Sequence, residues 1–152
     1  AVKRNKPLII GTANLSDKQI ENIREASKII PIYKGGNFRF DVKNFIDSVV
    51  DYAKTQDGDI KLVETHYKTK KVPSQTAVEM KERVKNEAGK ELIIESKLEY
   101  EGLINDYKVD NLHLHIEGFE QLAEDVLKIA SLMNNDLNPG MYSLSKLIDN
   151  EK

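Results

Sequence analysis

The chain has 152 residues, 39% hydrophobic and 32% charged, and its 23 Lys and Arg against 25 Asp and Glu leave a formal net charge of -2. Cysteine is absent, which excludes a disulfide framework, a thiolate metal site and a cysteine nucleophile. The apolar runs are far shorter than the roughly 20 residues of a membrane span, and the charges form no basic block. We therefore expect a soluble cytoplasmic protein without nucleic-acid or membrane partners.

The first part of the chain alternates predicted strands and helices. Short apolar or β-rich runs predict strands at 7–11, 31–33 and 60–65, and apolar residues at helical spacing predict helices at 16–30 and about 42–54. Ser16 and Gln19 form a capping box at the start of the first helix, and Pro31 ends it. This order of strands and helices predicts an α/β layer with a parallel sheet.

The second part has a different pattern. Ser74 is a good N-cap for a helix to about residue 88, strand-like runs follow at 91–99 and 107–116, and another helix is predicted at 119–133. Turns at 101–102 and 110–111 suit antiparallel pairing, and a short turn or helix is expected at 141–148. His113 and His115 face the same side of their strand, but a metal ion there needs a third ligand from elsewhere, so we predict no metal site. The alternatives are a plain strand face or a contact of one of these histidines with a substrate.

The segment 64–76 is the most polar one that directly follows a predicted parallel strand, where ligands bind in open α/β sheets. A histidine such as His66 exchanges a proton near neutral pH, and Lys70 supplies a positive charge. The helix start that follows offers N–H groups and hydroxyls for a carboxylate: Ser74, Gln75 and Thr76. These residues indicate an anion site beside an acid. The alternative is a solvated lysine loop with Ser74 as a simple cap.

Two further loops follow predicted strands, at 11–14 and 35–38. Together with the loop after His66 they would line one cleft at one edge of the sheet. The alternative is that their glycines only supply turns with positive φ.

Four segments, taken in order, resemble the 4-hydroxy-tetrahydrodipicolinate reductase family of bacterial lysine and diaminopimelate biosynthesis. KPLIIGTAN at 6–14 is similar to the family's KPLVIGTTG, and GNFRFDV at 36–42 is similar to its NFS-G-N loop. ETHYKTK at 64–70 and PSQTA at 73–77 match its signature E-x-H-H-x-x-K-x-D-A-P-S-G-T-A. PGMYSLSKL at 139–147 resembles its closing PGLYDM-D-L.

The resemblance implies an α/β fold in which the remnant of a Rossmann-type parallel sheet joins an α+β substrate-binding and oligomerisation domain with a mixed sheet. We accordingly predict the C-terminal part of a dinucleotide-binding domain at 1–58, a substrate-binding and assembly domain at 59–138, and a C-terminal return segment at 139–152. In the family the mixed sheet builds a tetramer, so a homo-oligomer is expected.

The implied activity is hydride transfer from NADH or NADPH to a cyclic unsaturated dicarboxylate with loss of a hydroxyl, which converts 4-hydroxy-tetrahydrodipicolinate to tetrahydrodipicolinate. By resemblance, His66 is the catalytic acid and Lys70 is its electrostatic partner. The resemblance assigns substrate binding to Tyr67, Ser74, Gln75 and Thr76. It assigns cofactor binding to Gly11, Thr12, Ala13, Asn37 and Phe38.

The chain also departs from the family pattern. Tyr67 replaces the second histidine, Gln75 replaces a glycine, and one residue is missing between Lys70 and Pro73. No G-x-G-x-x-G phosphate-binding fingerprint occurs, so the chain alone is expected to be inactive. It is interpreted either as a C-terminal piece of a longer reductase or as a shortened relative. The competing hypothesis is a non-catalytic binding or assembly domain derived from the same fold.

Overall fold

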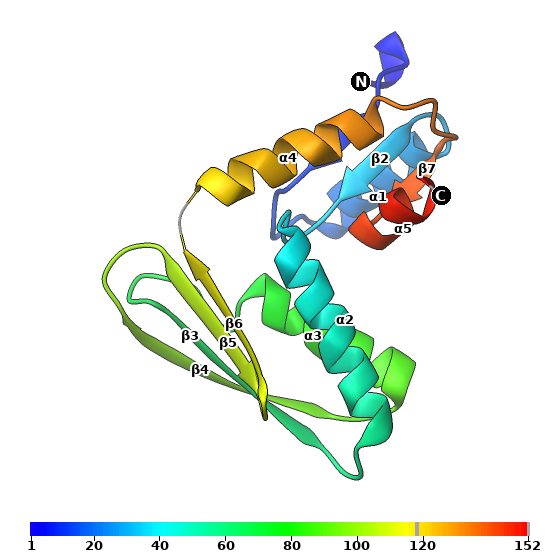
Figure 1. Ribbon diagram of the computed structural model, residues 1–152. Coiled ribbons are helices and arrows are strands. Elements are labelled where there is room, and N and C mark those ends of the chain that lie inside the picture. Colours follow the sequence, from blue (N-terminus) through cyan, green and yellow to red (C-terminus); the bar gives the residue numbers. More distant parts are fainter. Residues whose placement is uncertain (118, 152) are drawn as a thin grey trace. The chain divides into compact units, whose positions relative to one another are not determined.

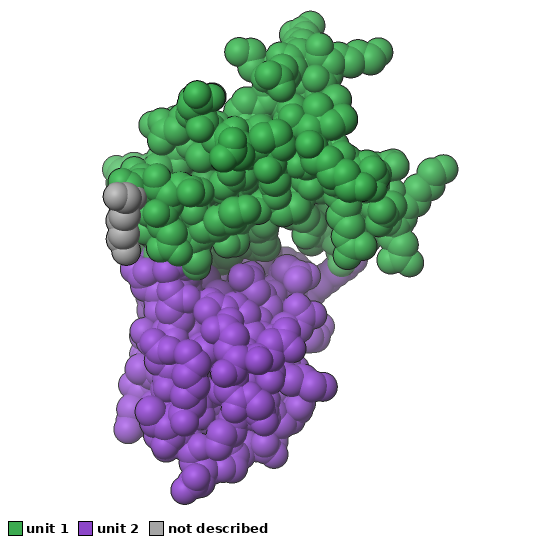
Figure 2. Space-filling view, turned by 90° about the vertical axis from the view of Figure 1, so that its right-hand side faces the viewer, with its two compact units in different colours: residues 1–40, 121–152 green, residues 41–120 purple. Residues whose placement is uncertain are grey.

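The computed structural model describes residues 1–117 and 119–151, which fold into two compact units (Figures 1 and 2). Unit 1 consists of residues 1–40 and 121–152, and unit 2 consists of residues 41–120. Each unit has its own sheet, with strand order β1-β2-β7 in the first and β4-β3-β5-β6 in the second. The predicted combination of a parallel sheet and a mixed sheet within an α/β fold is confirmed.

Unit 1 is built on a three-stranded parallel sheet. Its elements are η1 (Val2–Arg4), β1 (Leu8–Ile10), α1 (Asp17–Ser27), β2 (Pro31–Lys34), α4 (Glu120–Met133), β7 (Gly140–Tyr142) and α5 (Leu144–Asp149). β2 is the central strand and pairs in parallel with β1 and with β7. The C-terminal segment therefore returns to the sheet through β7, a strand that the sequence analysis did not predict, and α5 overlaps the turn or helix that was expected at 141–148.

Both faces of the unit 1 sheet are covered. Ile32 and Tyr33 are adjacent on β2, so they point to opposite faces, yet they are only 0% and 1% exposed. Tyr33 packs in a cluster with side chains of α4, β7 and α5, including Ile129, Met133 and Tyr142. α1 contacts β2 and β7, and its capping box of Ser16 and Gln19 is confirmed.

Unit 2 contains the mixed sheet. Its elements are α2 (Phe40–Thr55), β3 (Ile60–Tyr67), α3 (Gln75–Ala88), β4 (Leu92–Tyr100), β5 (Ile104–Val109) and β6 (Leu112–Glu117). β3 is parallel to β4 and antiparallel to β5, which forms a hairpin with β6. The predicted strand at 107–116 is thus two strands joined by the expected turn, where Asp110 adopts a positive φ of 46°.

One face of the mixed sheet, which we call the inner face, is covered by α2 and α3 (Figure 1). The core cluster of this face lies between the two helices and the sheet, and it includes Val49, Leu62, Met80, Leu92 and Val109. Burying an aliphatic side chain of this size contributes about 2 kcal/mol relative to leaving it in water. The inward positions of β3 are Ile60, Leu62, Glu64 and His66, so two polar residues continue the apolar row.

One structural expectation needs correction, and the compact units divide at other residues than the predicted domains. β3 does not extend the parallel sheet of β1 and β2; it begins the second sheet, because the apolar side of α2 packs in the core of unit 2. The compact units also change at residues 40 and 120, whereas the predicted domains change at 58 and 138. α2 and α4 explain the difference, since the first packs with the mixed sheet and the second with Tyr33 and Tyr142. The functions assigned to those domains stay predictions.

Candidate functional site

A buried polar cluster lies on the inner face of the mixed sheet. Glu64 and His66 are two residues apart on β3, so both side chains point inward, and both are 0% exposed. The N-cap of α3, β4 and β5 supply the remaining members. We call this group the Glu64 cluster, and it consists of Glu64, His66, Ser74, Ser96, Asn105 and Tyr107.

The Glu64 carboxylate accepts hydrogen bonds from three other members. The Ser74 hydroxyl donates to Oε2 at 2.6 Å, and the Ser74 backbone N–H donates to Oε1 at 3.0 Å. The Ser96 hydroxyl donates to Oε1 at 2.6 Å, and His66 Nε2 lies 2.9 Å from Oε2. A buried carboxylate is tolerated when donors surround it in this way.

These bonds set the ionisation of Glu64. Burial alone raises the pKa of this carboxyl, but the hydrogen bonds from His66, Ser74 and Ser96 outweigh it and lower the pKa from 4.5 to about 2. Glu64 is therefore an anion at neutral pH and can only accept hydrogen bonds.

The ring of His66 is held at both nitrogens. Nε2 faces the Glu64 carboxylate, and Nδ1 lies 2.7 Å from Asn105 Oδ1. The Tyr107 ring meets the imidazole edge to face at a centroid distance of 5.3 Å. Because Glu64 only accepts, Nε2 carries a proton. With an oxygen also facing Nδ1, the geometry fits a ring that donates from both nitrogens.

Tyr107 closes the cluster on the side of β5. Its hydroxyl lies 3.2 Å from the Ser74 hydroxyl. Burial raises the pKa of Tyr107, and hydrogen bonds with Ser74 and Thr76 oppose that rise. The phenol therefore stays neutral and adds a further link between β5 and the start of α3.

The side chain of Lys70 is not joined to His66 by any hydrogen bond or ion pair among residues 1–117 and 119–151. Its ammonium lies 5.8 Å from the centroid of the Tyr67 ring. Tyr67 follows His66 on the same strand, so the two side chains leave β3 on opposite faces. The structure therefore brings Lys70 and Tyr67 together and holds His66 with Glu64. The assignment of Lys70 as the electrostatic partner of His66 stays a prediction.

The start of α3 lies where the sequence predicted it. Ser74 is the N-cap, and its hydroxyl accepts a hydrogen bond from the Ala77 N–H at 3.1 Å. Its own N–H and hydroxyl bind the Glu64 carboxylate, so this residue already holds an internal anion. Gln75, the first helical residue, is exposed, while Thr76 is buried. The turn before them contains a cis peptide bond between Val72 and Pro73.

The loops predicted to border a cofactor belong to unit 1. Gly11, Thr12 and Ala13 follow β1 and are exposed. A Cβ on Gly11 would lie 2.5 Å from the Phe38 ring, so this glycine allows the two loops to approach closely. The side-chain oxygen of Asn37 accepts the Arg39 N–H at 2.9 Å. These loops meet at the carboxyl edge of β1 and β2, whereas His66 ends a strand of the other sheet, so the expectation of three loops on one sheet edge is wrong.

The sequence analysis did not identify four residues that form structural hydrogen bonds: Ser96, Asn105, Tyr107 and Asp125. Asp125 of α4 is buried, and it accepts the Phe40 N–H at 3.1 Å and faces Arg39 Nε at 3.5 Å. It therefore anchors the segment that follows the Asn37–Phe38 loop. Asn105 and Tyr107 could have been suspected from their two-residue spacing with Val109, which places all three on one strand face.

The opposite face of the mixed sheet, which we call the outer face, carries His113 and His115. Both lie against the carboxylate of Asp106, with His115 Nδ1 at 3.7 Å from Oδ1. A shallow pocket of about 430 Å³ lies beside them, lined by residues that include Val63, Thr65 and Lys108. Within the described part of the chain, no group of three or more histidines and carboxylates is arranged to hold a metal ion.

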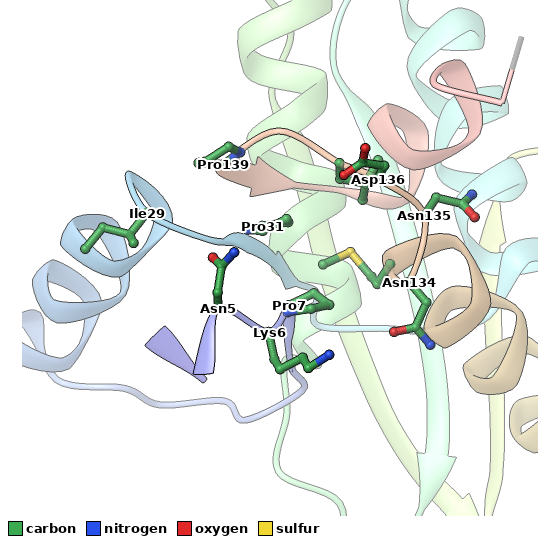
Figure 3. A pocket seen from close by; sticks show the side chains of 11 residues that line it. Asn5, Lys6, Pro7, Ile29, Pro31, Asn134, Asn135, Asp136 and Pro139 are labelled. Carbon is green, nitrogen blue, oxygen red and sulfur yellow. The ribbon is translucent and has the colours of Figure 1, made fainter. Parts of the chain in front are cut away.

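Unit 1 has a pocket of about 330 Å³ that contains none of the predicted site residues (Figure 3). Pro7, Pro31 and Pro139, which lie at or just before the starts of the three parallel strands, form part of its lining. It therefore lies at the amino edge of the sheet, opposite to the edge with Gly11 and Phe38.

No helix in the described residues is long and apolar enough to cross a membrane.

The two-sheet α/β architecture is shared with a known reductase. The chain superposes on dihydrodipicolinate reductase from Paenisporosarcina sp. TG-14, a structure with dipicolinate bound, with a TM-score of 0.68. The superposition covers 93% of this chain and 64% of that chain at 11% sequence identity. At this identity the likeness shows the fold alone.

The sequence relatives of the chain bear the name of one particular reductase. The chain is 40% identical over 80 residues to 4-hydroxy-tetrahydrodipicolinate reductase of Caldanaerobacter subterraneus, covering 51% of this chain and 32% of the relative. It is 34% identical over 94 residues to the reductase of Pseudoalteromonas atlantica, covering 60% and 35%. It is 28% identical over 154 residues to that of Rickettsia akari, covering 97% and 61%. No family model matches the chain.

These relatives confirm the resemblance to the 4-hydroxy-tetrahydrodipicolinate reductase family. The chain spans between 32% and 61% of their lengths. This partial coverage fits the predicted correspondence to a C-terminal portion of such a reductase.

Proposed function

We propose that the chain supplies the substrate-binding and catalytic half of a 4-hydroxy-tetrahydrodipicolinate reductase in lysine and diaminopimelate biosynthesis. The observation that carries the proposal is the shared carboxylate of Glu64. It joins His66, the residue matched to the family's acid, to Ser74 at the start of α3. The sequence relatives, which bear the name of this enzyme, support the same assignment.

The proposed substrate is a cyclic unsaturated dicarboxylate. The first turn of α3 offers N–H groups at Gln75 and Thr76 and the favourable end of a helix dipole for one carboxylate. Tyr67, the last residue of β3, and Lys70, which follows this strand, lie together and supply a phenol and a cation. His66 supplies a proton as negative charge develops on the substrate. A site that already holds the substrate beside this acid is preorganised for that protonation.

The proposed hydride donor is NADH or NADPH, and it supplies the two electrons of the reduction. The loops at the carboxyl edge of the unit 1 sheet are proposed to border its nicotinamide end, because nucleotides bind at such edges of open α/β sheets. The residues proposed to hold it are Gly11, Thr12, Ala13, Asn37 and Phe38. A cytoplasmic location and a homotetramer belong to the same proposal.

Binding of a substrate-like dicarboxylate tests the proposal. Pyridine-2,6-dicarboxylate (dipicolinate), the molecule bound in the related reductase structure, is titrated into the 152-residue chain by calorimetry. We expect saturable heat, and we expect Lys70→Ala to weaken binding about tenfold because it removes a charged partner. Lys71→Ala is the matched control, since Lys71 is an exposed neighbour, and it leaves the affinity unchanged. An absence of heat at millimolar ligand contradicts the proposal.

A second candidate is a non-catalytic binding or assembly domain derived from the same fold. The complete burial of His66 and the presence of Gln75 where the family has glycine favour it. For this candidate, dipicolinate does not bind, and His66→Gln changes only the stability of unit 2.

A further inference from the structure

The two ring nitrogens of His66 have unlike neighbours. Nε2 faces Glu64, which is completely buried and already held by Ser74 and Ser96. Nδ1 faces the amide of Asn105, which is half-buried. The Glu64 side of the ring is therefore fixed, and the Asn105 side is the one closer to solvent.

The sheet register shows where the covering of the inner face ends. In the row of Glu64, the neighbour on β5 is Tyr107, which is 3% exposed. In the row of His66, the neighbour on β4 is Leu98, which is 40% exposed, and the neighbour on β5 is Asn105. Exposure thus increases from one row to the next, so the side of the ring that faces Asn105 lies nearest to solvent.

We propose that His66 acts through Nδ1, that Glu64 is a positioning residue that holds Nε2, and that the Asn105 amide occupies the place of a substrate atom. The inference rests on the proposed function and specifies the reactive atom of that site. The roles given to Glu64 and Asn105 follow from the contact that each side chain makes with the His66 ring.

The proton transfer balances as follows. In the acid form of the ring, Nε2–H donates to the Glu64 carboxylate and Nδ1–H donates to Asn105 Oδ1. Once the hydroxyl of the substrate has left with a proton as water, the unsaturated ring accepts a hydride, an electron pair moves onto one of its electronegative atoms, and that atom forms a bond to the Nδ1 proton. The Nδ1–H bond breaks and its electrons stay on the ring, which becomes neutral. Nε2–H remains donated to Glu64, so the ring keeps its orientation.

Nitrogen NMR of the wild-type chain, with its histidines labelled with ¹⁵N, tests the assignment of the atoms. Addition of dipicolinate shifts the Nδ1 signal, saturably, by more than the Nε2 signal. A larger shift at Nε2, or saturable binding that moves neither nitrogen, overturns the inference while leaving the proposed function intact. No saturable response anywhere in the chain overturns the proposed function itself.

The variant Asn105→Ala tests the role of the amide. A ligand that binds to Nδ1 in the wild type must first break the hydrogen bond between Asn105 and this atom. The variant has no such bond to break, so we expect dipicolinate to bind it about fivefold more tightly. Asn111→Ala, in the exposed turn between β5 and β6, is the matched control and leaves the affinity unchanged. Weaker binding by Asn105→Ala overturns the displacement. The wild-type NMR titration decides the role of Nδ1 even where this variant fails to fold.

Discussion

The inner and outer faces of the mixed sheet carry the same kinds of groups in different surroundings. On the inner face, Glu64 and His66 are both 0% exposed and lie 2.9 Å apart. On the outer face, the side chains of Asp106, His113 and His115 are 22%, 54% and 43% exposed. Burial and the number of hydrogen bonds, rather than the identity of the residues, therefore distinguish the two carboxylate–histidine groups.

The energetic difference follows from water. A group on the outer face that loses its partner is solvated, so an exposed ion pair contributes about 0–1 kcal/mol. A group in the Glu64 cluster that loses its partner stays buried and unpaired, which costs about 3–5 kcal/mol for a charged pair. The inner face is thus sensitive to single substitutions, and the outer face is tolerant of them.

The largest expected effect is that of Glu64→Ala. This change leaves His66 Nε2, the Ser74 N–H and the Ser96 hydroxyl without their acceptor, and we expect the free energy of unfolding to fall by about 3–5 kcal/mol. Asp106→Ala, the matched change on the outer face, lowers it by at most about 0.5 kcal/mol. Urea denaturation of both variants measures the difference. Similar losses in the two variants would show that burial does not distinguish these carboxylates.

Acid tests the same comparison without a mutation. The pKa of Glu64 is lowered from 4.5 to about 2 in the folded chain, so its carboxylate contributes fully to stability above pH 4.5. That contribution is lost as the pH falls toward 2, and it amounts to about 3 kcal/mol. We expect Glu64→Gln to have a flatter dependence of stability on pH in this range than the wild type. Parallel curves for the two chains would assign the acid sensitivity to other carboxyls.

The sequence predicted the inward positions of β3 and the start of α3, but it did not predict the hydrogen-bond partners of the buried side chains. Alternation from Ile60 and Leu62 places Glu64 and His66 inward, and Ser74 is recognisable as a cap. The partners Ser96 and Asn105 lie 32 and 39 residues further along the chain from Glu64 and His66. Their contacts depend on strand register and on which strands pair, and no local pattern encodes either.

The error in sheet membership has a similar cause. An alternation of strands and helices predicts parallel strands, and both β1–β2 and β3–β4 are indeed parallel pairs. It does not say which pairs share a sheet. That depends on the core that α2 joins, and side chains such as Phe45 and Val49 pack with unit 2.

An intermediate effect is expected for Ser74→Ala. Ser74 caps α3 and also donates to Glu64, so its replacement removes a cap and leaves the buried carboxylate with one donor fewer. We expect a loss of about 2 kcal/mol. Ser16→Ala removes an exposed cap of α1 and costs about 1 kcal/mol. Thermal or urea unfolding of the two variants measures how much more stability Ser74→Ala loses than Ser16→Ala. Equal losses would mean that the contact of Ser74 with Glu64 contributes nothing.

The smallest expected effect is that of His113→Ala on the outer face. This imidazole is 54% exposed, and water replaces its contact with Asp106 when it is removed, so stability changes by at most about 0.5 kcal/mol. Because salt screens exposed charges, the change becomes smaller still at high ionic strength. A loss above about 1 kcal/mol that grows with protein concentration would contradict this expectation in an informative way. It would mean that another copy of the chain covers the outer face in solution, since only exclusion of water makes such a contact as costly to break as those of Glu64.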